Sequence, residues 1–560
     1  MFNPKLLVPQ WKEHFYLIII LAFAAIVRFV GLDYGLPLWL VGDEPSHIFG
    51  ALKMIELKTL LPVLHADEFV GTFHYTPYLS YLYILPFILV AGIKFLFFSG
   101  TFEQFKNYLI ADPSVFFITA RVISAVFGLA TVYFVYAAAR QMFQKKRIAL
   151  LSALFLALSF LPVSYSHWAR HWTAVTFFYT LGIYILANRG LTVSKRYLWV
   201  ALLMGIGVGM NVQMMIFGVL VILWFFIFDY QPIVKLLRQK WFWQAGGIFF
   251  SLFGFAFVLW PRGYGYLLSV GNITSAGATK DLIGLVDFFG FYIANLIRIE
   301  PLFLLFATVG LLSMFLVERR KALVFASFFF FYLAIFYLFF GYVDRFILPL
   351  YPFLAVSSGY GLAQVADRIS VRPLRLTIVV VVCVLLAIPI LRFNYLLIKN
   401  DTREQAINWA VANVSADAKV AVLTPLMRLP TTPENLQEQE NIDSASLRNV
   451  DRAEAKLGKQ LEQKFNALNL YTVGDKIFFS GLSEYLSRNN YQYLIYSPAF
   501  AIAKGALSLV GAPGEEALTF AGSENGVIGN ERIPDGFGDG LKELFYSSSL
   551  GPEIKIIKLF

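Results

Sequence analysis

Apolar runs long enough to cross a lipid bilayer recur along most of this 560-residue sequence. A membrane-spanning helix needs about 20 consecutive, mostly apolar residues, and HFYLIIILAFAAIVRFVGL at 14–32 is the first of many runs of that length. Hydrophobic residues make up 58% of the chain, and the mean hydropathy is +0.65, well above that of a soluble globular protein. The sequence therefore predicts a polytopic α-helical membrane protein.

The charge balance divides the chain into two parts. Residues 1–397 contain 30 Lys and Arg against 16 Asp and Glu, whereas residues 398–560 contain 16 against 20. The excess positive charge belongs to the apolar part, where basic residues in cytoplasmic loops explain it without a nucleic-acid partner. The single cysteine, Cys383, lies in an apolar run, so no intramolecular disulfide can form.

Basic clusters between the apolar runs predict the topology. They lie at 140–147, 189–196, 235–240, 319–321 and 368–375. If all of them face the cytoplasm together with the N-terminus, the sequence contains about eleven spans, near 15–32, 115–139, 148–165, 172–188, 197–211, 213–230, 241–260, 290–316, 322–341, 346–364 and 375–396. Residues 1–397 are then a transmembrane module with outer loops at 33–114, 166–171 and 261–289, and residues 398–560 lie outside.

The run PYLSYLYILPFILVAGIKFLFF at 77–98 does not fit this count. A crossing there would invert every later loop and place the five basic clusters outside. We therefore expect a re-entrant segment or a helix along the membrane surface, with a simple span as the alternative. In the same way, GMNVQMM at 209–215 is expected to be a turn, with one long kinked helix as the alternative.

The C-terminal region has the pattern of a small α/β domain. Asp401 and Glu404 have capping-box spacing before an amphipathic helix. The short apolar runs KVAVLT, KIFFS, YQYLIYS and EIKIIKLF predict strands, whereas 430–465 is polar and 511–540 is a Gly-rich loop. Nothing in this region resembles a nucleotide-binding fingerprint, so no nucleotide cofactor is expected.

Reactive side chains gather in the predicted outer loops. Asp43 and Glu44 follow the first span, and five of the six histidines fall in the first two outer loops. Carboxylates and imidazoles beside arginines suit general-base or metal-assisted chemistry on a phosphate-bearing substrate. The alternative is that wet loops carry charge in any protein, and that Asp43 and Glu44 cap a helix that begins at Pro45.

Four stretches support a more specific interpretation. They are GDEPSH at 42–47, FHYTPYLSYLY at 73–83, SFLPVSYSHWARHWTAVTFFYTLGIYI at 159–185 and DRFILPLYPFLAV at 344–356. In this order they resemble motifs of the polyprenyl-phosphate-sugar glycosyltransferases with the GT-C fold, which include protein O-mannosyltransferases and lipid A aminoarabinose transferases. The second stretch matches its motif only at the later proline, Pro77, and Trp172 stands where many relatives carry an acidic residue.

The resemblance implies an inverting membrane glycosyltransferase. Its donor would be a sugar on a polyprenyl-phosphate carrier, and its acceptor a lipid, a glycan or a protein on the extracytoplasmic face of a prokaryotic plasma (inner) membrane. Asp43 is the expected general base, with Glu44 second. The expected phosphate-binding cations are Arg262, Arg345, Arg170, Arg298, Lys280 and Arg121, and the expected substrate-binding residues are His74, Tyr75, His167 and His171.

A divalent metal ion held by Asp43 and His167 is a further expectation, because carboxylate oxygen suits hard cations and imidazole suits transition metals. Two other functions remain open. One is a polymerase or ligase that moves a whole glycan from its lipid carrier. The other is a transporter or lipid-glycan flippase, although such proteins often show internal repeats and charges buried within spans.

Overall fold

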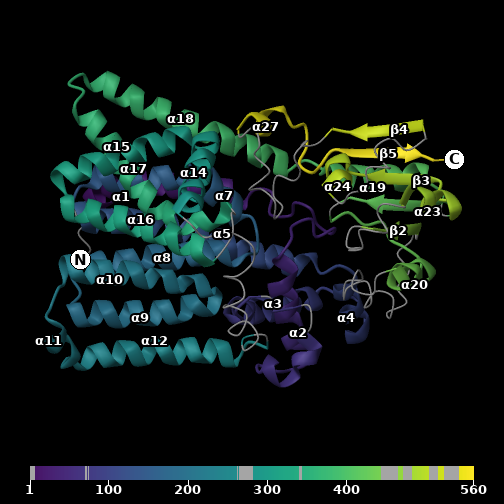
Figure 1. Ribbon diagram of the computed structural model, residues 1–560, viewed down its shortest axis with the longest axis horizontal. Helices are drawn as coiled ribbons and strands as arrows, with labels where there is room; N and C mark the ends of the chain where they lie inside the picture. The colour runs from purple at the N-terminus through teal and green to yellow at the C-terminus, as the bar shows by residue number, and fades with distance from the viewer. Residues whose placement is uncertain are drawn as a thin grey trace. The chain divides into compact units, whose positions relative to one another are not determined.

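The computed structural model describes residues 7–559 except 70–71, 74, 262, 264–281, 340–343, 416, 425, 443–464, 471–481, 504–514 and 522–540. The chain forms two compact units (Figure 1). The first is built from residues 1–32, 43–91 and 116–394, and the second from residues 33–42, 92–115 and 395–560.

The first unit is a bundle of apolar helices, as the sequence predicts (Figure 1). Its helices are α1 (Leu7–Phe29), α2 (Glu44–Glu56), η2 (Pro62–Phe69), α3 (Tyr78–Leu96), α5 (Ser114–Phe143), α6 (Lys146–Ala157), α7 (Phe160–Ser166), α8 (His171–Ala187), α9 (Val193–Met210), η3 (Val212–Ile216), α10 (Phe217–Phe228), α11 (Ile233–Leu237), α12 (Lys240–Val258), α14 (Leu282–Ile299), α15 (Pro301–Val317), α16 (Arg319–Phe339), η4 (Asp344–Leu350), α17 (Tyr351–Asp367) and α18 (Arg372–Leu397). Among the described residues, six helices are long and apolar enough to cross a membrane, or up to eight candidates with two bent pairs counted as one span each. The number that cross stays a prediction.

The basic loops meet at one end of this bundle. Helices α5 and α8 run parallel, because Phe127 packs on Phe177 and Phe134 on Tyr184 at ring-centre distances of 5.2 and 5.5 Å. The ends of α5 and α8 therefore lie on the same side, opposite their first residues. At the end of α5, an ion pair joins Arg147 to Asp367.

Further contacts bring the remaining basic loops to that end. Lys321 lies 4.8 Å from the centre of the Phe143 ring at the end of α5. Beyond α8, Arg196 binds Asp229 at 2.8 Å, which links the first turn of α9 to the end of α10. The polarity that the positive-inside rule requires is therefore present in the fold.

Helix α3 forms in the run that did not fit the predicted topology. It passes the length and hydropathy test for a span, and Leu85 and Leu89 are among its exposed apolar side chains. Two of its packing contacts, however, lie away from the basic loops: the Tyr78 hydroxyl donates to the Leu252 carbonyl oxygen in the second half of α12 at 2.9 Å, and Phe87 packs on Phe116 near the start of α5. These contacts agree with a helix that lies over the bundle end.

The turn at 209–215 is confirmed. Helix α9 ends at Met210, and Asn211 accepts a hydrogen bond from the Gln213 amide at 2.8 Å before η3 and α10. Tyr197 and Phe225 pack at a ring-centre distance of 6.0 Å, which shows that α9 and α10 form an antiparallel hairpin.

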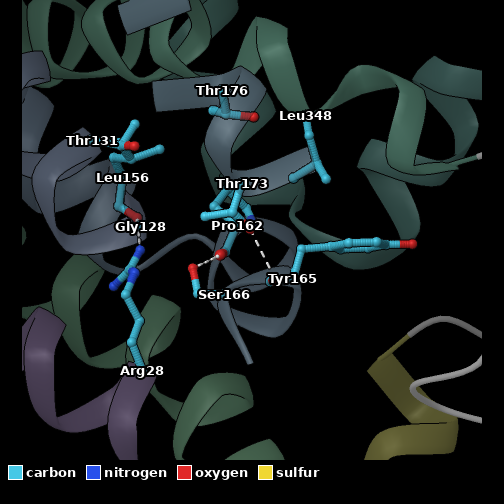
Figure 2. A pocket seen from close by; sticks show the side chains of 10 residues that line it. All are labelled: Arg28, Gly128, Thr131, Leu156, Pro162, Tyr165, Ser166, Thr173, Thr176 and Leu348. Atoms are coloured by element: carbon cyan, nitrogen blue, oxygen red, sulfur yellow. Dashed lines mark hydrogen bonds between the residues drawn. The ribbon is translucent and has the colours of Figure 1, made fainter. Parts of the chain in front are cut away.

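Two predicted spans are broken. The predicted span 148–165 consists of α6 and α7, bent by 59°, and the predicted span 290–316 consists of α14 and α15, bent by 119°. The predicted span over 290–316 is therefore divided between two helices, and whether it crosses the membrane as one span stays a prediction. Pro301 lacks an amide hydrogen and disfavours helical dihedrals at Glu300, where φ is −137° and ψ is 58°. At the first break, Arg28 reaches the Leu156 carbonyl oxygen (Figure 2).

The second unit contains the predicted α/β domain. Its sheet has the order β2 (Asn466–Asn469), β1 (Lys419–Leu423), β3 (Tyr493–Tyr496), β5 (Ile554–Lys558), β4 (Glu515–Phe520). Strands β1, β2 and β3 are parallel, and β5 pairs antiparallel with β3 and β4. The helices of this unit are α4 (Phe102–Ala111), α19 (Thr402–Asn413), α20 (Pro433–Ile442), α23 (Leu482–Arg488), α24 (Pro498–Ala503) and α27 (Leu541–Tyr546).

Alternate side chains of β1 pack into two cores. Val420 and Val422 join a cluster with α19, and Ala421 and Leu423 join a cluster with α23 and α24. The predicted strands at 419–424, 491–497 and 553–560 are confirmed, and the one at 476–480 lies outside the described residues. The Gly-rich loop expected over 511–540 is wrong at β4, and β2 begins directly after the predicted polar segment 430–465, where no strand was predicted.

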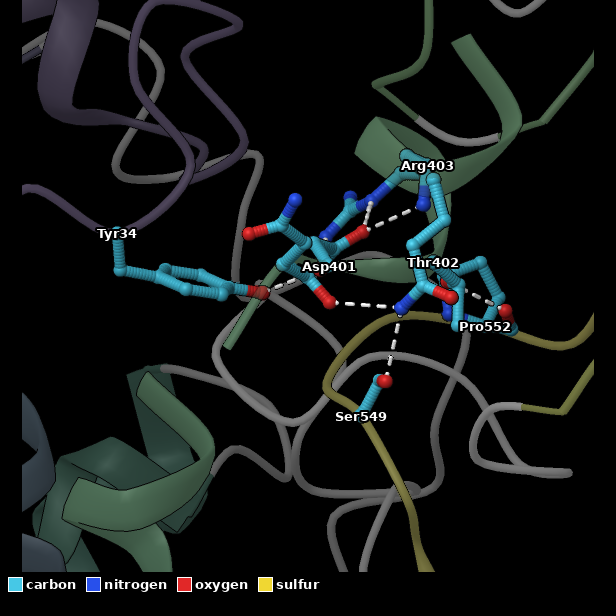
Figure 3. Close-up of polar contacts among 8 residues, drawn as sticks. Tyr34, Asp401, Thr402, Arg403, Ser549 and Pro552 are labelled. Carbon is cyan, nitrogen blue, oxygen red and sulfur yellow. Dashed lines mark hydrogen bonds and ion pairs between the residues drawn. The ribbon is translucent and has the colours of Figure 1, made fainter. Parts of the chain in front are cut away.

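Residues 33–42 belong to this second unit and are anchored by a buried polar cluster (Figure 3). The Tyr34 hydroxyl donates to Asp401 Oδ2, and Arg403 binds both Asp401 oxygens at 2.7 and 2.8 Å. Asp401 also accepts from the Arg403 amide at 2.8 Å, so it caps α19 as predicted. Burial and the Asp401 charge raise the pKa of Tyr34 well above its usual value, which keeps the hydroxyl a donor.

Labelling of single cysteines from one side of the membrane tests whether α3 crosses it. In a Cys383→Ala background, we expect Asp67→Cys and Lys106→Cys to react from the same side, as the predicted re-entrant or surface position of residues 77–98 requires. Lys195→Cys, in a basic loop, is the control and should react from the opposite side. All three replaced residues are exposed. Reaction of positions 67 and 106 from opposite sides would show that α3 spans the membrane.

Candidate functional site

The two adjacent acids of GDEPSH have different surroundings. Asp43 stands at the N-cap position of α2 with a left-handed backbone, φ 65°, and its side chain makes no capping hydrogen bond. Capping by Asp43, the alternative considered from the sequence, is therefore wrong. The side chain of Glu44, the first residue of α2, is completely buried. Because the backbone at Asp43 is left-handed, the side chains of Asp43 and Glu44 point into different surroundings.

Glu44 forms a buried ion pair that fastens three segments together. Its carboxylate binds Arg121 of α5 through two hydrogen bonds, Nε–Oε1 at 2.9 Å and Nη2–Oε2 at 2.7 Å. Oε1 also accepts from the Ala169 amide at 2.7 Å. Arg121 donates in turn to the Leu32 carbonyl oxygen at 2.8 Å. Glu44 and Arg121 therefore hold α2, α5 and the loop before α8 together, and neither is placed as a base or a donor-phosphate ligand.

Asp43 remains at the surface of this arrangement. Its side chain is 21% exposed, and Oδ2 accepts a hydrogen bond from the Tyr75 hydroxyl at 2.9 Å. Arg170 Nη2 lies 3.8 Å from the same oxygen, an electrostatic contact that is too long for a hydrogen bond. Burial, and then the Asp43 charge, raise the pKa of Tyr75, so the hydroxyl stays protonated and continues to donate to Asp43.

Two histidines enclose Tyr75. The Tyr75 ring lies 5.3 Å from that of His47 and 4.5 Å from that of His171, and His47 Nε2 is 3.3 Å from His171 Nδ1. His47 was not among the predicted site residues. Its place four residues after Asp43, about one helical turn, was the available signal. Trp172 is buried and packs on His171 and Phe346.

The structure places the predicted phosphate-binding cations in different surroundings. Arg170 and Arg345 belong to the Asp43 neighbourhood, since the charges of both act on Tyr75. Arg345, at the start of η4, is half-buried. Arg298 is exposed on α14, and no contact in the described part of the chain brings it to Asp43. Arg262, Lys280 and His74 lie outside the described residues.

His167 is not placed to share a metal with Asp43. Its Nδ1 faces the Val163 carbonyl oxygen at 2.9 Å and its Nε2 faces the Val30 carbonyl oxygen at 3.0 Å. Burial lowers the pKa of His167 to about 4, so the ring is neutral near pH 7. The described residues include no group of three or more His, Cys, Asp and Glu that could hold a metal ion. Dependence on a metal stays a prediction, and within the described part of the chain Asp43 and His167 do not belong to a site with three such ligands.

Residues 114–260 match a protein family model described as dolichyl-phosphate-mannose-protein mannosyltransferase. The match confirms the resemblance to this group of enzymes over that stretch. It contains Arg121, Arg170 and His171, but it ends before Arg345 and begins after Asp43 and Tyr75. A comparison with curated proteins gave no match.

Solved structures with similarity include ArnT from Cupriavidus metallidurans in the apo state. It has 12% sequence identity and a TM-score of 0.44, and the match covers 97% of this chain and 98% of that one. The oligosaccharyltransferase of Archaeoglobus fulgidus in the apo form has 14% identity and a TM-score of 0.47, and the match covers 91% of this chain and 73% of that one. Because both TM-scores lie below 0.5, these likenesses carry no conclusion about this chain.

Substitutions of Glu44 and Asp43 should change the free energy of unfolding by different amounts. Glu44→Gln leaves Arg121 buried without its counter-charge, and we expect a loss of about 3–5 kcal/mol in the free energy of unfolding. Asp43→Asn should change it by less than about 1 kcal/mol, as at exposed ion pairs. Thermal unfolding of the purified protein in detergent measures both. As a control, Arg121→Met added to Glu44→Gln should recover part of the loss. Equal losses for the two single variants would contradict the assignment.

Proposed function

We propose that this protein is an inverting glycosyltransferase that moves a sugar from a polyprenyl-phosphate carrier to an acceptor on the extracytoplasmic face of a prokaryotic plasma membrane. The observation that carries the proposal is the state of Asp43: a partly exposed carboxylate, held by Tyr75 and beside Arg170, at the bundle end opposite the basic loops. The family match over 114–260 supports the same class of reaction.

Asp43 is the proposed general base. In the transfer, the acceptor hydroxyl or amine attacks the anomeric carbon of the sugar, its proton moves to the Asp43 carboxylate, and the bond from the anomeric carbon to the phosphate oxygen breaks. Attack opposite the leaving phosphate inverts the anomeric centre. The hydrogen bond from the Tyr75 hydroxyl to Oδ2 fixes the orientation of the Asp43 carboxylate and leaves Oδ1 for the acceptor proton.

Arg170 and Arg345 are the proposed phosphate ligands among the described residues. Negative charge grows on the departing polyprenyl phosphate, and cations already in position stabilise it. Both arginines are close enough to influence Tyr75 electrostatically, so a phosphate bound between them would lie near the base. Arg262 and Lys280 remain proposed ligands from the sequence alone. No nucleotide takes part, because the donor already carries an activated sugar.

Turnover of a synthetic polyprenyl-phosphate sugar by the purified protein tests the proposal. Asp43→Asn should lower kcat by about 10²–10⁴-fold, the usual contribution of a general base, while the protein stays folded. Release of free polyprenyl phosphate is the measurement. Asp67→Asn is the matched control, because Asp67 is an exposed acid of the same predicted outer loop, and its turnover should equal that of the wild type.

Two outcomes would contradict this assignment. Unchanged turnover by Asp43→Asn would remove Asp43 as the base. Movement of an intact lipid-linked glycan across the membrane of vesicles that contain the protein, without release of polyprenyl phosphate, would favour a flippase instead.

A further inference from the structure

Two charged side chains lie deep in the helical unit, each away from the Asp43 site. Arg28 of α1 is 1% exposed, and Glu300, between α14 and α15, is 4% exposed. Neither has an ionic partner among the described residues. A charge buried among membrane helices is energetically expensive and usually has a function. The contacts of both side chains converge on one place, the break between α6 and α7.

Glu300 satisfies the amide side of this break. The first amides of any helix have no partner within the helix, and Ser159, the N-cap residue of α7, does not cap them, because its hydroxyl donates to the Phe155 carbonyl oxygen at 2.8 Å. Glu300 Oε1 accepts from the Leu161 amide at 3.2 Å, and the Phe160 amide also faces this carboxylate. Glu300, distant in sequence, thus takes the place of the missing cap.

Arg28 adds a contact on the carbonyl side. Its Nη2 donates to the Leu156 carbonyl oxygen at 3.3 Å, one residue before the end of α6 (Figure 2), and this oxygen also accepts from the Ser159 amide at 3.4 Å. Arg28 Nη1 donates to the Ala24 carbonyl oxygen at 3.2 Å. Gly128 of α5 leaves the space for this side chain. A Cβ atom at position 128 would lie 3.1 Å from Arg28 Nε and 2.3 Å from Ser166 Oγ. Any larger residue would displace the guanidinium or the end of α7.

The signs of the two charges match the helix dipoles. A helix carries partial negative charge at its C-terminus and partial positive charge at its N-terminus. Arg28 therefore lies at the favourable end of α6, and Glu300 at the favourable end of α7. The two side chains therefore lie on either side of the helix break, Arg28 at the end of α6 and Glu300 at the start of α7.

The break has a direct connection to the acid pair. Helix α7 has seven residues, and directly beyond it the Ala169 amide binds Glu44 and Arg170 lies beside Asp43. A displacement of α7 at the break would therefore move Arg170 relative to Asp43. We propose that Arg28 and Glu300 are positioning residues that hold α7, and through it Arg170, in the geometry required for transfer. This inference rests on the proposed function.

Kinetic coupling between Glu300 and Arg170 tests the proposal. Glu300→Ala should lower kcat by about 10–100-fold, the effect of a misplaced catalytic geometry, with little change in the KM for the acceptor. Because Glu300 acts through Arg170, adding Glu300→Ala to Arg170→Ala should slow turnover by no more than about 2-fold further. Glu300→Gln keeps an acceptor oxygen for the Leu161 amide, so it should restore most of the activity. Arg28→Met should resemble Glu300→Ala.

Ser358→Ala is the matched control. Ser358 is a buried polar residue whose hydroxyl donates to the Phe303 carbonyl oxygen at 3.0 Å, so its variant disturbs α15 near Glu300 without touching α7. It should leave both kcat and the coupling unchanged. Multiplicative losses in the double Glu300→Ala and Arg170→Ala variant would overturn the proposal, because they would indicate a general structural defect.

Amide hydrogen exchange provides a readout that does not need turnover. In Glu300→Ala, amides within 160–170 should exchange at least about 10-fold faster, since the break opens locally, and Ser358→Ala should exchange as the wild type does. If the wild type transfers no sugar, the proposed function fails while exchange still tests the break. If the wild type transfers sugar but Glu300→Ala keeps wild-type turnover and exchange, the positioning role is wrong.

Discussion

The buried ion pair between Glu44 and Arg121 is the interaction on which the geometry of the candidate site depends. Two charges removed from water are favourable only with good geometry and further hydrogen bonds, and this pair has both, with two direct contacts, the Ala169 amide and the Leu32 carbonyl oxygen. Because the pair joins α2, α5 and the loop before α8, it brings Asp43 and Arg170 together. The carboxylate of Glu44 thus holds the site together, and the carboxylate of Asp43 lies at its surface.

The same physical rule applies elsewhere in the helical unit. At the break between α6 and α7, the buried side chains of Arg28 and Glu300 contact backbone groups of opposite polarity, a carbonyl oxygen and an amide hydrogen. The basic loops around Arg147 and Arg196 instead form ion pairs with Asp367 and Asp229 at the end opposite Asp43. The position of the basic loops and the hydrogen bonds of the buried charges have the same physical cause. An unmatched charge in an apolar medium has a high free energy.

The sequence predicted what depends on local composition. Long apolar runs predicted the helices and their order, and short apolar runs predicted β1, β3 and β5. It could not predict contacts between distant positions: nothing local indicates that Glu44 pairs with Arg121, or that Glu300 replaces the cap of α7. The break at Glu300 had a signal, since Pro301 follows, but the apolar run around it concealed the bend. Asp43 and Tyr75 were predicted site residues, but the hydrogen bond between them could be recognised only in the structure.

A structure with polyprenyl phosphate bound tests the central claim most directly, because the claim concerns where the donor phosphate meets Asp43. The account predicts phosphate oxygens at hydrogen-bonding distance, about 3 Å, from Arg170 or Arg345, with the Asp43 carboxylate facing the same space and the bond from Tyr75 intact. A phosphate bound at the opposite end, among the basic loops around Arg147 and Lys321, would contradict it.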